Sequence, residues 1–273
     1  MGGKYKLLPQ ILPLFPENIN RFVDLFCGGG NIGVNVKAKQ IICNDFQKEV
    51  IEFLDACNNT DSEEMLLKIL DIVNTYKLSK TNAEGYLKLR EDYNNGHKSW
   101  LTFYSLICHA FNNQIRFNSK GNYNMPFGKD RSSFNPTLQK KFINFVDELK
   151  KKNIKFINKD FRKLPFDKLN SNDFVYADPP YLITCASYNE NDGWNEKHER
   201  DLISLLDKLN KQGVKFALSN VLEDKGKSND ILKEWVIKYN INHLNHTYGN
   251  CNYQAKDKSK DGTVEVLITN YKY

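Results

Sequence analysis

A short apolar run that ends at three glycines places the strongest constraint on the fold. Residues 22–26 are Phe-Val-Asp-Leu-Phe, and Gly28-Gly29-Gly30 follow shortly after them. This pattern predicts a buried strand, a glycine turn and the start of a helix. Residues 40–44 are predicted to form a second buried strand that stops at Asp45, before a helix over about 46–57. A strand, a helix and a strand at this spacing predict a βαβ unit, and therefore a parallel sheet.

A helical block interrupts the sheet-forming part of the chain. Apolar residues at helical spacing predict helices over residues 63–76, 84–93, 100–111 and 136–150. Residues 112–131 instead alternate polar and apolar side chains around Ser119-Lys120-Gly121, which predicts a hairpin. Strands resume at 155–157, 174–177, 214–219 and 263–269, with helices at 202–211 and 231–239. The sequence therefore predicts an α/β fold with an insertion.

Composition and charge indicate a cytoplasmic protein with a mildly basic surface. The 39 Lys and Arg exceed the 33 Asp and Glu, giving a net charge of +6, which is compatible with a polyanionic partner and with many other proteins. The six cysteines lack metal-type pair spacing, so we expect reduced, buried thiols. No run approaches a membrane span, and the N-terminus lacks a signal-peptide pattern. His243 and His246 have no nearby acidic or Cys partner, so we expect no metal.

The motif Asp178-Pro179-Pro180-Tyr181 follows the predicted strand 174–177 and carries the clearest chemistry. An exocyclic amine such as N6 of adenine is a poor nucleophile, because its lone pair is delocalised into the ring. A carboxylate from Asp178 and the carbonyl of Pro179 can each accept one N–H and free that lone pair. The two prolines fix φ and remove competing donors, and Tyr181 offers a ring face to an extruded base. The competing interpretation is a Pro-stiffened turn.

The glycine turn and Asp45 indicate an adenosine-type cofactor. A carboxylate that ends the second strand can hold ribose hydroxyls. No Lys-Ser/Thr pair follows the glycines, which argues against a nucleoside triphosphate in a P-loop. A nicotinamide dinucleotide is the alternative. Together with the Pro-Pro motif, the turn favours S-adenosylmethionine, whose sulfonium drives methyl transfer without a Ser, Cys or His nucleophile.

Over nearly its whole length the chain resembles the Dam family of DNA adenine-N6 methyltransferases, especially the phage-type members. The stretches that carry the resemblance are Phe22-Val-Asp-Leu-Phe-Cys-Gly-Gly29, Lys77-Leu-Ser-Lys-Thr81, Tyr86-Leu-Lys-Leu-Arg-Glu-Asp-Tyr93, Pro126-Phe-Gly-Lys129, Phe174-Val-Tyr176, Asp178-Pro-Pro-Tyr-Leu-Ile-Thr184 and Leu218-Ser-Asn-Val-Leu-Glu223. The resemblance implies a Rossmann-like class I S-adenosylmethionine-dependent methyltransferase fold, with one antiparallel strand near the sheet edge. It also implies methylation of adenine within GATC.

The resemblance divides the chain and assigns a cofactor site. Residues 1–57 and 146–273 would form the catalytic, cofactor-binding domain, and residues 58–145 a mainly helical target-recognition domain. The expected cofactor-binding residues, from the motifs and the resemblance together, are Lys4, Asp24, Phe26, Gly28, Gly30, Asp45, Asp160, Phe161 and Asp178. One departure is at the start, where the family usually has an aromatic residue shortly before the Lys that Lys4 matches.

The predicted hairpin mixes base-reading side chains with aromatics. Arg116 can pair with guanine through two hydrogen bonds, and Lys120, Lys129 and Arg131 can contact phosphates. A solvated polar hairpin is the competing interpretation. The full set of expected DNA contacts, which draws on the resemblance, is Asn112, Arg116, Asn118, Lys120, Pro126, Lys129, Arg131 and Tyr188. One departure is at Asp130-Arg131, because related phage enzymes carry the arginine one position earlier. Tyr188 matches the aromatic residue that fills the space left by the flipped base.

The resulting hypothesis is an adenine-N6 methyltransferase that acts on duplex DNA, at GATC, by base flipping. We expect it in the cytoplasm, associated with the nucleoid of a bacterial or phage-infected cell, as a monomer or a weak dimer on DNA. One alternative is an enzyme that uses the same motif on RNA adenine or on a glutamine amide. A DNA-binding protein that has lost catalysis is the other alternative.

Overall fold

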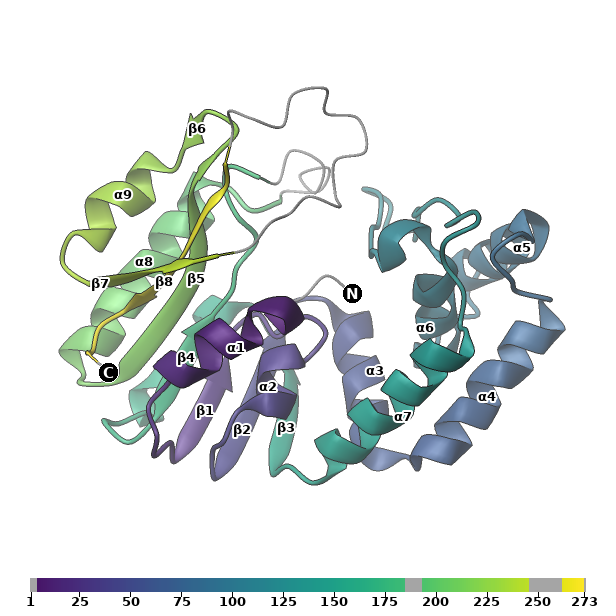
Figure 1. Ribbon diagram of the computed structural model, residues 1–273, viewed down its shortest axis with the longest axis horizontal. Coiled ribbons are helices and arrows are strands. Elements are labelled where there is room, and N and C mark those ends of the chain that lie inside the picture. Colours follow the sequence, from purple (N-terminus) through teal and green to yellow (C-terminus); the bar gives the residue numbers. More distant parts are fainter. Residues whose placement is uncertain (1–3, 185–192, 246–261, 273) are drawn as a thin grey trace.

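The computed structural model describes residues 4–184, 193–245 and 262–272, and a mixed sheet forms its centre (Figure 1). The strands of this sheet are β1 (Arg21–Asp24), β2 (Gln40–Asp45), β3 (Ile154–Asn158), β4 (Phe174–Ala177), β5 (Lys215–Asp224), β6 (Lys227–Ser228), β7 (Asn240–Leu244) and β8 (Val264–Thr269). They follow the order β3-β2-β1-β4-β5-β8-β7, with β6 paired to β5. Strands β1 to β5 are parallel, whereas β8 is antiparallel to both neighbours. The predicted Rossmann-like α/β fold, with its antiparallel strand near the edge, is confirmed.

Both faces of the sheet are apolar, because helices cover both. Phe22 and Phe174 point into one buried cluster, whereas Val23 and Val175, the next residues along the same strands, point into the other. Successive side chains of a strand alternate between faces. A short continuous apolar run is therefore what a doubly covered parallel strand requires.

The helices form a layer on each side and a further block beyond one edge of the sheet (Figure 1). They are α1 (Leu8–Ile11), α2 (Asn31–Asn35), α3 (Lys48–Asn59), α4 (Ser62–Thr75), α5 (Ala83–Asn94), α6 (Trp100–His109), α7 (Pro136–Lys150), α8 (Glu196–Lys211) and α9 (Asp230–Val236). Short 3-10 turns are η1 (Lys4–Leu7), η2 (Leu12–Leu14), η3 (Phe111–Asn113), η4 (Phe161–Lys163) and η5 (Phe166–Lys168). In the described parts of the chain, no helix combines the length and apolarity needed to cross a membrane.

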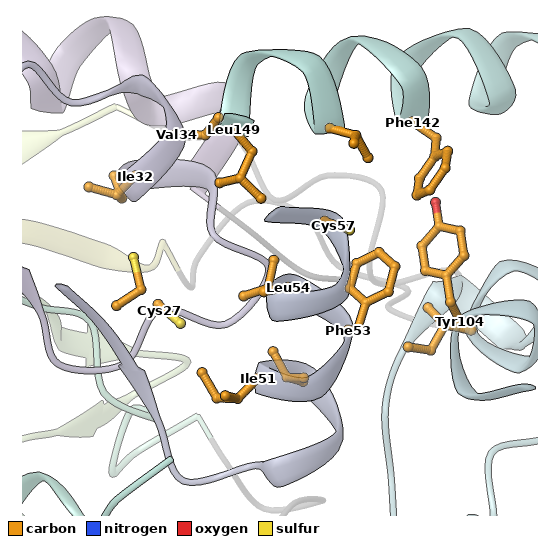
Figure 2. Close-up of a cluster of buried hydrophobic side chains, with 14 of the residues drawn as sticks. Cys27, Ile32, Val34, Ile51, Phe53, Leu54, Cys57, Tyr104, Phe142 and Leu149 are labelled. Atoms are coloured by element: carbon orange, nitrogen blue, oxygen red, sulfur yellow. The ribbon is translucent and has the colours of Figure 1, made fainter. Parts of the chain in front are cut away.

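Helix α3 joins the sheet to the helical block through one hydrophobic cluster (Figure 2). Its Leu54 and Cys57 face the side of the cluster that holds Ile32 and Leu149. On its other side the Phe53 ring stacks on Tyr104 of α6, with ring centroids 4.4 Å apart and planes 6° apart. The helical block therefore shares a continuous core with the sheet.

The structure departs from the sequence predictions at several boundaries. The segment 112–131 holds isolated bridges at Ala110–Phe127 and Phe117–Tyr123 in place of a continuous hairpin ladder. Helix α8 begins at Glu196, well before the predicted residue 202, because Asn195 caps it by accepting a hydrogen bond from the His198 amide. Strand β7 and the N-terminal elements η1, α1 and η2 were not predicted.

Gly33 leaves no room for a side chain between α2 and β2. A Cβ at this position would lie 2.6 Å from the Sγ of the buried Cys43. Gly33→Ala is expected to lower the free energy of unfolding by about 1–3 kcal/mol through overpacking, measured by urea denaturation. In the control variant, Gly262→Ala, the new Cβ meets nothing within 4 Å, and a change of no more than about 0.5 kcal/mol is expected. Equal midpoints for the two variants would contradict this prediction.

Candidate active site

Three aspartates lie at the carboxyl ends of three neighbouring strands. Asp24 is the last residue of β1, Asp45 is the last residue of β2, and Asp178 directly follows β4. Strands β2 and β4 flank β1 and run parallel to it, so the three carboxylates share one edge of the sheet. In open α/β sheets, ligands bind at this edge, where the strand order reverses.

The glycine turn after β1 is fixed to the end of β2 by Asp45. Gly28 has a φ of 48° and Gly30 a φ of 73°, in the left-handed region that side chains avoid. The Gly28 amide donates to Asp45 Oδ2 at 2.8 Å, and the Gln47 amide donates to Asp45 Oδ1 at 2.9 Å. Burial raises the pKa of Asp45, and the backbone donors lower it. The carboxylate predicted to hold a ribose is therefore already oriented by the backbone.

Asp24 is a buried carboxyl group with one oxygen that has no partner within the described residues. Its side chain is 1% exposed, and its Oδ1 has no hydrogen-bond partner there. Burial and the charge of Asp178 raise the pKa of Asp24 well above its usual range. An ammonium or sulfonium group would supply the missing partner. Both occur in S-adenosylmethionine, so this residue fits that cofactor.

Aromatic side chains line the same edge beside the glycine turn. The Phe26 ring lies 5.3 Å from Phe161 and 5.4 Å from Trp194, centroid to centroid. Phe161 directly follows Asp160, and both are among the residues expected to bind the cofactor. The carboxylate of Asp160 is bonded to Arg162, which lowers its pKa. A cofactor contact by Asp160 would therefore compete with this ion pair.

Asp178 belongs to a cluster of charged and hydroxyl groups. The Lys4 ammonium lies 3.1 Å from Asp178 Oδ1 and 2.5 Å from Glu265 Oε1. The Tyr181 hydroxyl accepts a hydrogen bond from Lys4, and it lies 3.0 Å from Asp178 Oδ1 and 3.1 Å from Glu265 Oε1. Burial raises the pKa of Asp178, and Lys4 lowers it. The structure thus brings together three predicted residues, Lys4, Asp178 and Tyr181, and adds Glu265.

Two hydrogen-bond acceptors of the Asp178-Pro179-Pro180-Tyr181 motif receive no hydrogen bond from the described part of the protein. Within the described ranges no donor bonds Asp178 Oδ2 or the carbonyl oxygen of Pro179. Pro179 is buried and Pro180 is exposed. An amine with two N–H groups needs two such acceptors, one for each hydrogen.

Most of the expected DNA contacts within residues 111–131 are exposed, whereas Arg116 and Asn118 are half-buried. Asn112, Lys120, Pro126, Lys129 and Arg131 are all exposed. The Arg131 guanidinium lies 5.8 Å from the ring centroid of Phe111. Tyr188 lies outside the described residues.

Two of the expected DNA contacts also hold the segment together. Arg116 donates from Nε to Asn124 Oδ1 and from Nη2 to the Asn124 carbonyl oxygen, both at 2.8 Å. Asn118 Oδ1 accepts from the amides of Lys120 and Asn122, both at 3.0 Å, and so shapes the turn at the tip. These contacts give both side chains a structural role beside any base readout.

Sequence reasoning missed three groups near the site, the buried Glu199 and Glu265 and the half-buried Trp194. Glu265 lies in β8 and Trp194 joins the aromatic cluster. Glu199 accepts from Trp194 Nε1 at 2.6 Å, and its Oε1 accepts from Asn220 Nδ2 and Asn229 Nδ2, both at 3.0 Å. The sequence feature that could have indicated Glu265 is a charged residue within the otherwise uncharged, β-branched run 263–269. Nothing along the sequence indicated its partners.

A family model for the D12 class of N6 adenine-specific DNA methyltransferases matches residues 1–250. The chain belongs to this family. It is 48% identical, over 99% of its length, to the type II methyltransferase M.FokI of Planomicrobium okeanokoites. It is 43% identical, again over 99%, to the modification methylase StsI of Streptococcus sanguinis. The chain spans 42% of the length of each of these two proteins.

The comparisons confirm an N6 adenine-specific DNA methyltransferase of the D12 class, and the phage-type Dam assignment and its GATC sequence stay predictions. A DNA adenine methylase of Vibrio cholerae is 26% identical over 80% of this chain and 78% of its own length. The chain is thus less similar to it than to M.FokI and StsI, whose names state no recognition site. Membership of the D12 class therefore does not select GATC.

Replacing Arg116 tests whether this side chain reads a base or only stabilises the segment through its hydrogen bonds to Asn124. A two-bond contact to guanine contributes about 1–3 kcal/mol of discrimination, so Arg116→Ala is expected to relax methylation at that guanine and leave cofactor affinity unchanged. The matched control is Asn124→Ala, which removes the Oδ1 contact to Arg116 and keeps the guanidinium. Methylation rates on a panel of substituted duplexes measure both. The same preference in both variants as in the wild type, or identical losses in both, would contradict a reading role.

Proposed function

We propose that this protein methylates N6 of adenine in duplex DNA with S-adenosylmethionine as the methyl donor. The observation that carries the proposal is the position of Asp178 and Pro179 at the end of β4. There the two acceptors left without a described donor stand beside the Asp24 and Asp45 carboxylates of the neighbouring strands. Because the chain spans 42% of its relatives M.FokI and StsI, we treat its activity and substrates as proposals.

One set of residues would bind the cofactor, and another would bind the target adenine. Asp45 and the Gly28 turn would hold the adenosine part of the cofactor, and Phe26 and Phe161 would pack on its ring. Asp24, whose Oδ1 has no partner among the described residues, would bind its ammonium. S-adenosylmethionine supplies an activated methyl group on a sulfonium. Asp178 and Pro179 would each accept one N–H of the adenine amine, orient its lone pair and stabilise the positive charge that develops on nitrogen.

The target amine lies inside a base-paired duplex, so the adenine must leave the stack to reach Asp178. Tyr181 lies against the same carboxylate and offers a ring face to the extruded base. The exposed segment of residues 111–131 carries the basic side chains that would grip the duplex. We therefore propose residues 58–145 as the target-recognition part, with residues 1–57 and 146–273 as the catalytic part; the second boundary falls within α7.

Transfer of tritium from labelled cofactor to three substrates tests the proposal. Duplex DNA that contains adenines should be labelled, whereas adenine-containing RNA and a glutamine-containing peptide should not. Label on RNA or on the peptide alone would support the alternative enzymes. Binding to DNA without label on any substrate would support a protein that has lost catalysis.

We propose GATC as the recognition sequence, on the strength of the resemblance and of Arg116. Duplexes with a single substitution at each of the four positions give the test. The GATC duplex should be methylated fastest, by about tenfold or more over each variant. Faster methylation of a substituted duplex than of the GATC duplex would contradict this proposal.

A further inference from the structure

Glu265 is a buried carboxylate near the start of a sheet strand. It lies on β8, opposite Val221 of β5 and Leu244 of β7, and it is 2% exposed. An ionised side chain at such a position is unfavourable unless it is paired and hydrogen-bonded. Its described partners are the Lys4 ammonium and the Tyr181 hydroxyl, both on Oε1.

The same two groups also hold Asp178. Lys4 and Tyr181 both bond Asp178 Oδ1, so Asp178 and Glu265 share one cation and one hydroxyl. Asp178 is thereby anchored through one oxygen, and its other oxygen has no donor among the described residues. Among the described residues, one ammonium between two carboxylates gives the cluster a net negative charge when all three are ionised.

We propose that Glu265 is a positioning residue for methyl transfer, which acts by sharing Lys4 and Tyr181 with Asp178. It fixes the Asp178 carboxylate through Oδ1, and it keeps Lys4 from fully neutralising the negative charge beside the target amine. This inference rests on the proposed function of the site.

The charge matters because the amine becomes positive during transfer. The nitrogen lone pair forms the new N–C bond while the C–S bond breaks, and the electron pair of that bond remains on sulfur. The nitrogen carries the positive charge until one N–H proton leaves to solvent. A fixed negative charge next to that nitrogen stabilises the transition state more than the ground state.

The cluster also predicts the direction of a pH effect. Besides Glu265 on β8, the groups that face Asp178 are Lys4 on η1, Tyr181 on its own loop, Asp24 on β1 and Tyr176 on β4. Burial raises the pKa of Asp178, Lys4 lowers it, and Glu265 raises it. Transfer needs the ionised carboxylate, so activity falls as pH drops through this pKa. Removal of the Glu265 charge should therefore move the acid limb of the profile to lower pH.

The test measures the yield of methylated DNA for Glu265→Gln and for wild type, under single-turnover and steady-state conditions. We expect kcat to fall by about 10- to 100-fold, as for loss of a preorganised charge, with KM for DNA and cofactor within about threefold. The acid limb of kcat should shift to lower pH, and Glu265→Asp should recover part of the loss. The matched control is Glu223→Gln on β5, an exposed partner of Lys233, which should leave both readouts unchanged.

A second variant keeps the inference testable if Glu265→Gln fails to fold. Lys4→Gln removes the shared cation, so the acid limb should move to higher pH, opposite to the effect of Glu265→Gln. A kcat within twofold of wild type for a folded Glu265→Gln, or an acid limb that does not move in either variant, would overturn the role of Glu265. Absence of methyl transfer by wild type to any DNA would instead overturn the proposed function itself.

Discussion

Replacing Asp178 with Ala is expected to reduce methyl transfer by about 10³-fold or more, as for loss of a preorganised group in a water-excluded site. The variant loses the acceptor that would orient the amine, and it leaves Lys4 beside Glu265 with no negative charge next to the nitrogen. DNA binding should stay within a few-fold of wild type. The exposed segment 111–131, which would grip the duplex, does not include Asp178.

Single-turnover transfer of labelled methyl groups measures this loss, and fluorescence anisotropy of a labelled duplex measures binding. The matched control is Asp167→Ala, which removes an exposed carboxylate paired with Lys208 on another part of the surface. That variant should transfer methyl groups at the wild-type rate. A rate of methyl transfer near that of wild type in Asp178→Ala would contradict the proposed role of Asp178 in the reaction.

Replacing Asp45 with Ala is expected to weaken cofactor binding by about 10- to 100-fold. A hydrogen bond to a charged group contributes about 1.5–3 kcal/mol, and Asp45 would supply one to the ribose. Its carboxylate also holds the Gly28 amide, so the variant loosens the turn against which the cofactor would lie. The effect should appear in the dissociation constant of the cofactor, while the preference among DNA sequences stays unchanged.

Isothermal titration of S-adenosylmethionine or its demethylated product gives the dissociation constant directly. Asp55→Ala on α3 serves as the control, because Asp55 is exposed and its side chain has no hydrogen bond to the turn among the described residues. If Asp45→Ala binds cofactor within twofold of the control, the ribose is held elsewhere and the role of Asp45 is wrong.

The sheet and its polar edge could be predicted from the sequence because each strand is short and covered on both faces. Residues 22–26 and 174–177 are nearly continuous apolar runs, and each leads directly to a turn that carries a functional side chain. Parallel strands bring such turns to one edge. The local pattern therefore located Asp45 and Asp178 at strand ends, whereas the strand order that brings them next to Asp24 is known from the structure.

Glu265 could not be placed in the same way. Lys4 and Glu265 lie at opposite ends of the chain, and they meet because β8 inserts between β5 and β7 in antiparallel direction. Within its own strand, Glu265 resembles an ordinary polar position of an alternating pattern. Its burial depends on neighbours from both adjacent strands, which the local sequence does not encode.

The hairpin prediction failed in detail for local backbone reasons. Asn112 and Asn113 adopt positive φ values of 53° and 52°, which turn the chain where a strand would continue. Pro126 has no amide hydrogen to donate to a ladder. The alternation of polar and apolar residues does not reveal the positive φ values or the missing amide hydrogen. It therefore predicted paired strands where the structure has isolated bridges.

The central claim is that the site of Asp178, Pro179 and Tyr181 methylates N6 of adenine in duplex DNA. The direct measurement is mass spectrometry of the nucleosides released from a duplex after incubation with the protein and S-adenosylmethionine. Wild type should yield N6-methyl-2′-deoxyadenosine as the one new nucleoside, and Asp178→Ala should yield about 10³-fold less. A methylated cytosine as the product, or equal N6-methyladenine yields from both proteins, would contradict the account.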